Sequence, residues 1–263
     1  LLRQLQMVRM QPLLLRDIFG CRWEEGIICD KIISFFLTYW LVKTNIGHNN
    51  IINEDIGEEN MIVKKLDEQK VGKIGHAFGY YDYGKEKGLV SCYRSQEAAA
   101  VYINGYVRMA VKAGMLHTTS EKGEAYIAYK VPGQKISLSA GIELVKAFFQ
   151  SMTMSEMVHF FRAMSQGGAG LQSRMDKEKK PYIFVGLVCV TEEYQGQGYM
   201  RKVMEMAFAE GNRLQIPVIL DTDAQSKCDK YMHLGMQLAG TRDCGEHGKL
   251  YDLIKYPDAP QGK

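Results

Sequence analysis

Residues 185–213, VGLVCVTEEYQGQGYMRKVMEMAFAEGNR, predict a buried strand, a glycine-containing turn and an amphipathic helix in direct succession. The strand, residues 182–190, is apolar almost throughout, which is typical of a strand that is buried on both faces. After Met200 the apolar side chains recur at helical spacing, at Val203, Met204, Ala207 and Phe208. The turn 191–199 therefore lies between the carboxyl end of a buried strand and the start of a helix.

This turn has the features of an anion-binding site. The first amides of a helix have no intrahelical acceptor, and the helix dipole places partial positive charge there. Gly196 and Gly198 allow a ligand to approach the backbone closely because neither carries a side chain. Arg201 and Lys202 oppose the dipole in the first helical turn, which fits a multiply charged guest such as a pyrophosphate.

Two closely spaced glycines have three other interpretations. A dinucleotide-binding motif requires a third glycine and a place early in a strand–helix–strand repeat, and this segment has neither. The phosphate-binding motif G-x-x-x-x-G-K-S/T is absent. A tight strand-to-helix connection that binds nothing remains possible on the glycines alone.

Two motifs in order resemble the GNAT acyltransferase family. The coenzyme A-binding motif of that family reads Arg/Gln-x-x-Gly-x-Gly/Ala, and here Gln195 and Gly198 fit it, whereas Met200 replaces the last small residue. Residues 231–236, YMHLGM, resemble the family's Y-x-x-L-G-F helix end, with Met236 in place of Phe. The resemblance covers residues 79–256.

The resemblance implies an α/β protein of the α+β type. We expect a GNAT-like central mixed, mostly antiparallel sheet flanked by helices, with an extra helical insertion at residues 139–164. Hydrophobic periodicity and capping residues predict the elements along the chain. The expected strands are 89–93, 115–119, 125–131, 182–190, 217–221, 236–241 and 249–256; the expected helices are 96–113 (capped by Ser95), 140–150 (capped by Ser139), a third from the capping box 153–156 through 164, 200–213 and 224–234; residues 166–180 are expected to form a mobile loop.

The resemblance also implies a site and a reaction. The strand before the glycine turn and the next parallel strand should diverge, so that the backbone of Val188 and Val190 binds a pantetheine arm. The pyrophosphate of acetyl-CoA, the expected co-substrate, would bind at Gln195, Gly196, Gln197, Gly198, Tyr199, Met200 and Arg201. An amine would attack the thioester directly, and Tyr231 would protonate the leaving thiolate. Ala224 stands where the family often has Asn, so one pantetheine contact is missing.

A general base is harder to identify. Glu192 and Glu193 follow the predicted strand, and Asp221 and Asp223 follow its neighbour, at the edge where parallel sheets bind ligands. Each also fits a solvated carboxylate, and Asp223 fits a helix cap. His117 and His159 are further candidate bases by position, although a lone histidine at helix or strand spacing is usually structural. The tyrosines at 80, 81 and 83 fit either an acceptor site or exposed loop positions.

Composition limits the other functions. The formal net charge is +3, and no basic stripe alternates with aromatic residues, so no nucleic-acid partner is expected. The six cysteines have no C-x-x-C spacing, which argues against a zinc site, and their pattern suggests a reducing, cytoplasmic setting. The apolar run 32–42 is shorter than the ~20 residues that span a bilayer, so no membrane partner is expected.

The chain divides into two parts. Residues 1–60 are expected to be an N-terminal extension, poorly ordered or preceding a natural start at Met61, and residues 61–263 the GNAT-like domain; an N-terminal appendage that packs on a partner through residues 32–42 is the alternative. The expected function is transfer of an acyl group to a small-molecule or protein amine by a monomer or homodimer. The alternatives are a GNAT-fold acyl-CoA-binding module without catalysis and an unrelated nucleotide-binding domain.

Overall fold

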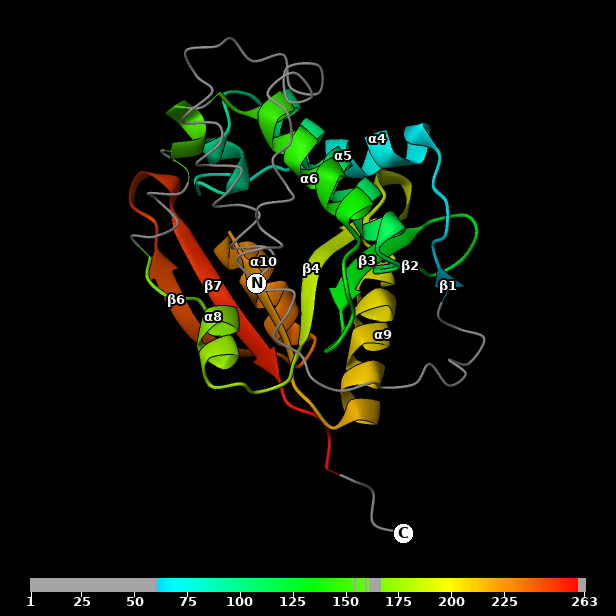
Figure 1. Cartoon of the computed structure of the whole chain (residues 1–263). Coiled ribbons are helices and arrows are strands. Elements are labelled where there is room, and N and C mark those ends of the chain that lie inside the picture. The colour runs from blue at the N-terminus through cyan, green and yellow to red at the C-terminus, as the bar shows by residue number, and fades with distance from the viewer. Residues whose placement is uncertain (1–60, 154, 159, 161–166, 260–263) are drawn as a thin grey trace, which may run out of the picture. The chain divides into compact units, whose positions relative to one another are not determined.

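The computed structural model describes residues 61–259, apart from 154, 159 and 161–166. The predictions for residues 1–60 therefore lie outside the described residues. Within them, one seven-stranded sheet has the order β1-β2-β3-β4-β5-β7-β6 (Figure 1). The strands are β1 Met61–Ile62, β2 Leu116–Thr118, β3 Ala125–Lys130, β4 Ile183–Val190, β5 Val218–Thr222, β6 Gln237–Asp243 and β7 Lys249–Lys255.

The sheet is mixed and mostly antiparallel. Only β4 and β5 are parallel neighbours, and every other adjacent pair runs antiparallel. A parallel pair needs a crossover connection, which here is the helix that follows β4. The expected fold class is thus confirmed by the strand order and directions.

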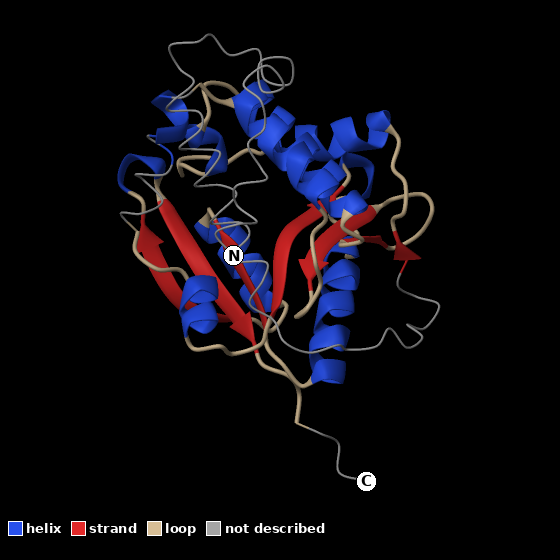
Figure 2. Ribbon diagram, in the orientation of Figure 1, coloured by secondary structure: helices blue, strands red, loops and turns tan. Residues whose placement is uncertain are grey.

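Helices cover both faces of the sheet, as Figure 2 shows. One face packs against α9 and α10, and the opposite face packs against α4 and α5, with α8 over Ile219 and Ile254. Helix α6 lies against α5. The helices are α4 Glu68–Gly79, α5 Gln96–Lys112, α6 Leu138–Ser151, α8 Leu171–Lys177, α9 Tyr199–Leu214 and α10 Gln225–His233.

A β-bulge in β4 exchanges the faces to which its side chains point. Val185 is opposite Tyr129 of β3 and Leu187 is opposite Ala128, so Gly186 is the extra residue. Before the bulge Ile183 and Val185 join the core under α9, and after it Leu187 and Cys189 join the core under α5. A Cβ at this position would lie 1.9 Å from the hydroxyl of Tyr106 on α5, so a larger residue would displace that side chain.

Two capping signals in the sequence correctly predicted where a helix begins. The Ser95 hydroxyl accepts from the Ala98 amide at 3.1 Å and caps α5. The capping box at 153–156 forms, because the Thr153 amide donates to Glu156 at 2.6 Å and the Glu156 amide donates to the Thr153 hydroxyl at 3.3 Å. The end of that predicted helix, through residue 164, lies partly outside the described residues.

Three predictions about elements are wrong, and one helix was missed. Residues Leu89–Cys92 form a 3-10 helix rather than a strand, and the first described strand is Met61–Ile62. Ser137 rather than Ser139 caps α6. The expected loop 166–180 contains α8, whose Met175 is buried on the sheet. Helix α4 was not expected at all, although the Asp67 carboxylate caps it through the Lys70 amide at 2.8 Å.

Candidate functional site

The glycine turn adopts a backbone that glycine favours. A short 3-10 helix, Glu192–Tyr194, follows β4, and Gly196 and Gly198 then have φ of 73° and 82°. These values lie in the left-handed region, where a side chain would be strained. Gly198 is the N-cap of α9, and no side chain caps that helix. The space where either glycine would carry a Cβ is open to at least 4 Å.

The backbone amides of residues 196–200 form what we term the amide cradle. Among the described residues, none accepts a hydrogen bond from these amides, whereas the next two, of Arg201 and Lys202, donate to the Gly198 carbonyl at 3.1 and 3.4 Å. Amides at a helix start without acceptors are available to an anion. The Gln195 side-chain amide donates to the Val190 carbonyl at 3.4 Å, which ties the turn to the end of β4.

Strands β4 and β5 diverge beside the amide cradle. They pair at Ile183 with Val218 and at Phe184 with Ile219, and no further pairing is present in the described part of the sheet. The Thr191 amide donates toward β3, to the Glu124 carbonyl at 3.0 Å. Because backbone groups alternate along a strand, those of Val188 and Val190 point toward the diverging β5. The predicted pantetheine groups therefore lie at the unpaired edge of β4.

Tyr231 reaches the same region from α10. It packs against the core formed with α9, and its hydroxyl makes no hydrogen bond to a described residue. Burial raises the pKa of the Tyr231 phenol well above its usual range, and the nearby carboxylate of Asp223 raises it further. The phenol thus stays protonated at neutral pH and can act as a hydrogen-bond donor.

A second group of side chains, the clasp, holds residues 81–86 against the start of α10. The Tyr83 hydroxyl donates to Asp223 at 2.6 Å, and Lys227 donates to Asp223 at 2.8 Å and to the Tyr83 hydroxyl at 3.0 Å. The Lys227 ammonium also lies 4.2 Å from the ring centre of Tyr81. The clasp places Tyr81 and Asp223 close enough to raise the pKa of Tyr231.

The clasp corrects the prediction that Asp223 caps α10. Ala224 is the N-cap residue of α10, and its side chain makes no capping hydrogen bond. The Glu86 carboxylate instead accepts from the Gln225 amide at 3.1 and 3.0 Å, from 139 residues earlier in the chain. Tyr83 and Lys227 were not recognised as a pair because only the fold brings them together. The sole sequence signal was the tyrosine-rich run that ends at residue 83.

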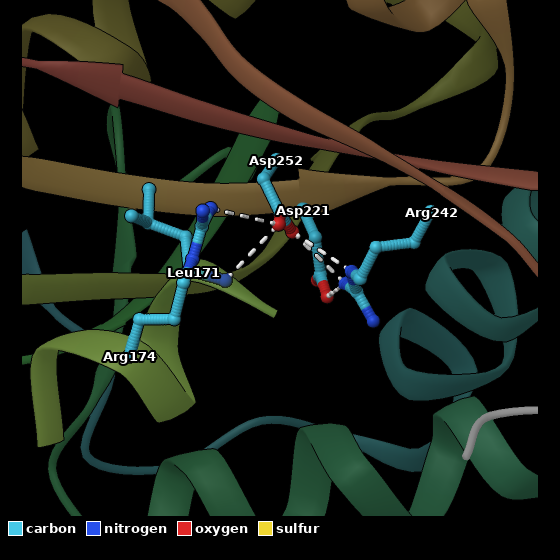
Figure 3. Close-up of polar contacts among 5 residues, drawn as sticks. All are labelled: Leu171, Arg174, Asp221, Arg242 and Asp252. Atoms are coloured by element: carbon cyan, nitrogen blue, oxygen red, sulfur yellow. Dashed lines mark hydrogen bonds and ion pairs between the residues drawn. The ribbon is translucent and has the colours of Figure 1, made fainter. Parts of the chain in front are cut away.

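A buried ionic network, missed in the sequence, lies on the opposite half of the sheet (Figure 3). Asp252 of β7 is only 2% exposed and accepts from the Arg242 guanidinium of β6 at 3.1 and 2.9 Å. Its second oxygen accepts from the Leu171 amide at the start of α8 at 3.0 Å, with Arg174 3.6 Å away. Arg242 also donates to Asp221 of β5 at 2.6 Å. The network orients the Asp221 carboxylate at the edge facing β4.

Among the other candidate bases, Glu193 and His117 make contacts of their own, and His159 lies outside the described residues. Glu193 accepts from Lys73 of α4 at 2.7 Å, on the surface. His117 is buried on β2 and stacks on Tyr129 with ring centres 4.3 Å apart. Burial lowers the pKa of His117, so its imidazole is neutral.

Within residues 61–259, as far as they are described, no three His, Cys, Asp or Glu side chains converge as metal ligands. No helix in the same residues combines the length and apolar character needed to cross a bilayer.

Comparison with known proteins gives similarities in structure only. No protein-family model and no curated protein sequence matches the chain. A histone acetyltransferase and related acetyltransferase from Corynebacterium glutamicum is 10% identical with a TM-score of 0.46, over 75% of this chain and 96% of its own. Arylalkylamine N-acetyltransferase 2 from Aedes aegypti is 10% identical with a TM-score of 0.46, over 73% of this chain and 97% of its own. Polyamine N-acetyltransferase from Drosophila melanogaster is 14% identical with a TM-score of 0.42, over 73% and 97%.

Proposed function

We propose that this protein is an acetyl-CoA-dependent N-acetyltransferase that transfers the acetyl group to an amine. One observation carries the proposal: the amide cradle, without acceptors among the described residues, lies at the end of β4 where β4 leaves β5. A diphosphate fits the cradle, and an extended arm fits the unpaired backbone edge beside it. A plain strand-to-helix connection has no need for both features together.

The predicted cofactor residues take different roles in this proposal. Val188 and Val190 offer backbone groups to the pantetheine arm. The amides of Gly196, Gln197, Gly198, Tyr199 and Met200 bind the diphosphate, and Gln195 holds the turn through the Val190 carbonyl. Arg201 is exposed in the first turn of α9, where its charge adds to the attraction for phosphate.

The reaction follows from this placement. The neutral amine nitrogen attacks the thioester carbonyl; the new C–N bond forms, the C–S bond breaks, and the amine proton leaves to water. Tyr231 donates a hydrogen bond, and then its proton, to the departing thiolate and regains a proton from solvent. Because burial raises the pKa of Tyr231, acid strength contributes less than the positioning of the two reactants.

Binding is tested by thermal unfolding of the full chain with acetyl-CoA. A ligand at about 100 times its Kd stabilises the folded state by about 2.7 kcal/mol, so a clear rise in Tm is expected. NAD and ATP at the same concentration serve as comparisons. No rise with acetyl-CoA together with a rise with NAD or ATP would reject the proposal in favour of an unrelated nucleotide-binding domain.

A matched pair of variants locates the binding site. Gly198→Asp places a carboxylate in the amide cradle and should abolish stabilisation by acetyl-CoA. Gly114→Asp introduces the same charge at another left-handed glycine, with φ of 64° and open space around it, at the end of α5. Gly114→Asp should keep the full rise in Tm. Equal loss in both variants would show that strain or charge alone, rather than the cradle, controls binding.

Catalysis is tested by release of free thiol from acetyl-CoA over a panel of amines. Steady thiol release that depends on an amine supports the transferase. Stabilisation by acetyl-CoA without turnover of any amine would support the binding module without catalysis instead.

A further inference from the structure

The level at which β4 and β5 stop pairing is the place where an acceptor could meet the acyl group. Phe184 and Ile219 are the last paired residues, and Gly186 and Asp221 each lie two residues further along their parallel strands. Gly186 and Asp221 are therefore at the same height on opposite sides of the divergence. In the proposed function the pantetheine arm runs along β4 from the amide cradle toward this point, so the acyl carbonyl arrives here.

The Tyr106 hydroxyl lies at the same point. It occupies the place of the absent side chain of Gly186, 1.9 Å from where a Cβ would be. Among the described residues it has no hydrogen-bond partner, and its side chain is only half-buried. Burial raises the pKa of the Tyr106 phenol above its ordinary range, and the neighbouring phenol of Tyr102 and carboxylate of Asp221 add to this, so the hydroxyl is neutral and lies within the electrostatic reach of Asp221.

Hydrogen bonding fixes the position of the Asp221 carboxylate. Arg242 donates to it at 2.6 Å, and Arg242 is itself fixed by the buried Asp252 (Figure 3). The Asp221 side chain is nevertheless 44% exposed, so solvent or a ligand reaches it.

The other members of the network are packed more tightly than Asp221. The loop 167–170 passes close to the Arg242 side chain, since a Cβ on Gly170 would lie 3.0 Å from the guanidinium carbon. Helix α8 begins there with the Leu171 amide bound to Asp252. Of Asp221, Arg242 and Asp252, Asp221 is therefore the side chain most open to solvent.

We propose that Asp221 and Tyr106 form the acceptor subsite and bind the protonated amino group of a small primary amine beside the bulge at Gly186. The inference rests on the proposed function, which it extends to the acceptor. The ammonium donates to the Asp221 carboxylate and to the Tyr106 oxygen, and it releases a proton to water before the nitrogen attacks. The charge of Asp221 selects cationic amines over neutral isosteres.

Calorimetric titration of the full chain saturated with CoA tests this without turnover. The probes are 2-phenylethylamine, which is cationic at pH 7.5, and its neutral counterpart 2-phenylethanol. We expect Asp221→Asn to weaken amine binding about 30-fold and Tyr106→Phe about fivefold, as befits charged and neutral hydrogen bonds. Asp229→Asn, which removes an exposed carboxylate from α10, should stay within about twofold.

A further variant tests the acceptor subsite without changing Asp221, in case the Asp221 variant misfolds. Gly186→Ala leaves Asp221 untouched but displaces the Tyr106 hydroxyl, and should weaken the amine about as much as Tyr106→Phe does. The inference is overturned if Asp221→Asn, with a Tm near that of the wild type, keeps the amine affinity within twofold. It is also overturned if 2-phenylethanol binds as tightly as the amine, or if Tyr106→Phe and Gly186→Ala both leave the affinity unchanged.

The result separates this inference from the proposed function. Binding of CoA without selective binding of the amine rejects the acceptor subsite alone. Failure to bind CoA rejects the proposed function, and titration of the amine into the free protein then decides whether Asp221 and Tyr106 form a cation site.

Discussion

In the half of the sheet formed by β1–β4 the described ion pairs lie at the surface, as with Lys73 and Glu193, whereas the half formed by β5, β7 and β6 buries one. The first half is held by apolar side chains such as Leu116 and Ile127, both inaccessible to solvent. The second half depends on Asp252, which joins β7, β6 and α8. Among the described strands, the backbones of the two halves pair at only two positions, Ile183 with Val218 and Phe184 with Ile219.

The two halves of the sheet therefore offer different kinds of group to the candidate site, backbone amides in the first half and side chains in the second. In the proposed function the first half supplies the backbone amides of the cradle, whose conformation depends on glycines. The second half would supply the side chains of Tyr231 and Asp221, whose positions depend on the clasp and on the ionic network. Changes in the second half should therefore alter stability and side-chain chemistry together.

The largest effect is expected from Asp252→Asn. The change removes the charge that compensates buried Arg242, and breaking a buried ion pair costs about 3–5 kcal/mol. Urea unfolding should show this loss, whereas Asp229→Asn should remain within about 0.5 kcal/mol. Replacing both partners, with Arg242→Met and Asp252→Leu, should recover most of the stability. A loss below about 1 kcal/mol for Asp252→Asn would mean that the second half is not held by this network.

Tyr231→Phe should lower kcat by about 10- to 100-fold without changing stabilisation by acetyl-CoA, because only the donor to the thiolate is removed. The exposed Tyr256, changed to Phe, is the control and should leave kcat unchanged. Thiol release at saturating substrates is the measurement. An unchanged kcat in Tyr231→Phe would assign the proton donor to another group or to water.

Tyr83→Phe should destabilise the protein by about 1 kcal/mol, because the phenol bonds both Asp223 and Lys227 in the clasp. Tyr80→Phe, which loses an exposed contact to Glu97, is the control and should unfold like the wild type. Urea unfolding distinguishes the two. If both variants match the wild type, the clasp adds nothing to the second half.

The smallest effect concerns pH and His117 in the first half. Burial lowers the pKa of His117 in the folded state, so the unfolded chain binds this proton more readily. Its contribution to stability is present above about pH 6.5, the unfolded value, and is lost as pH falls toward the folded pKa. Unfolding from pH 8 to pH 5 should show a decline that is smaller in His117→Gln. The exposed His76, changed to Gln, should retain the whole decline.

Local signals were enough for much of the fold. The apolar run of β4, the glycine turn and the periodicity of α9 lie within 32 residues, and each has a local physical cause. Ser95 and the box at 153–156 gave helix starts because a cap acts on amides two or three residues away. The glycine turn was likewise recognised from the sequence, although the left-handed backbone of Gly196 and Gly198 was not predicted.

Features that depend on distant residues were missed. Helix α8 is short and polar in sequence, and it forms where its first amide meets Asp252, 81 residues away. Glu86 caps α10 across 139 residues, which displaced Asp223 from the expected role. At the site, the backbone cradle was predictable because it is local, whereas the clasp and the pairing of Asp221 with Arg242 arise only from tertiary structure. The cofactor residues and the role of Tyr231 stay predictions.

The central claim is that the amides of residues 196–200 bind the diphosphate of coenzyme A. Titration of the isotope-labelled full chain with CoA, followed by amide resonances, tests it directly. If these amides bind the diphosphate, the largest downfield shifts are expected on Gly196, Gly198 and their neighbours through Met200, and the Gly114 resonance should stay unchanged. Saturable binding of CoA that leaves these amides unshifted would contradict it.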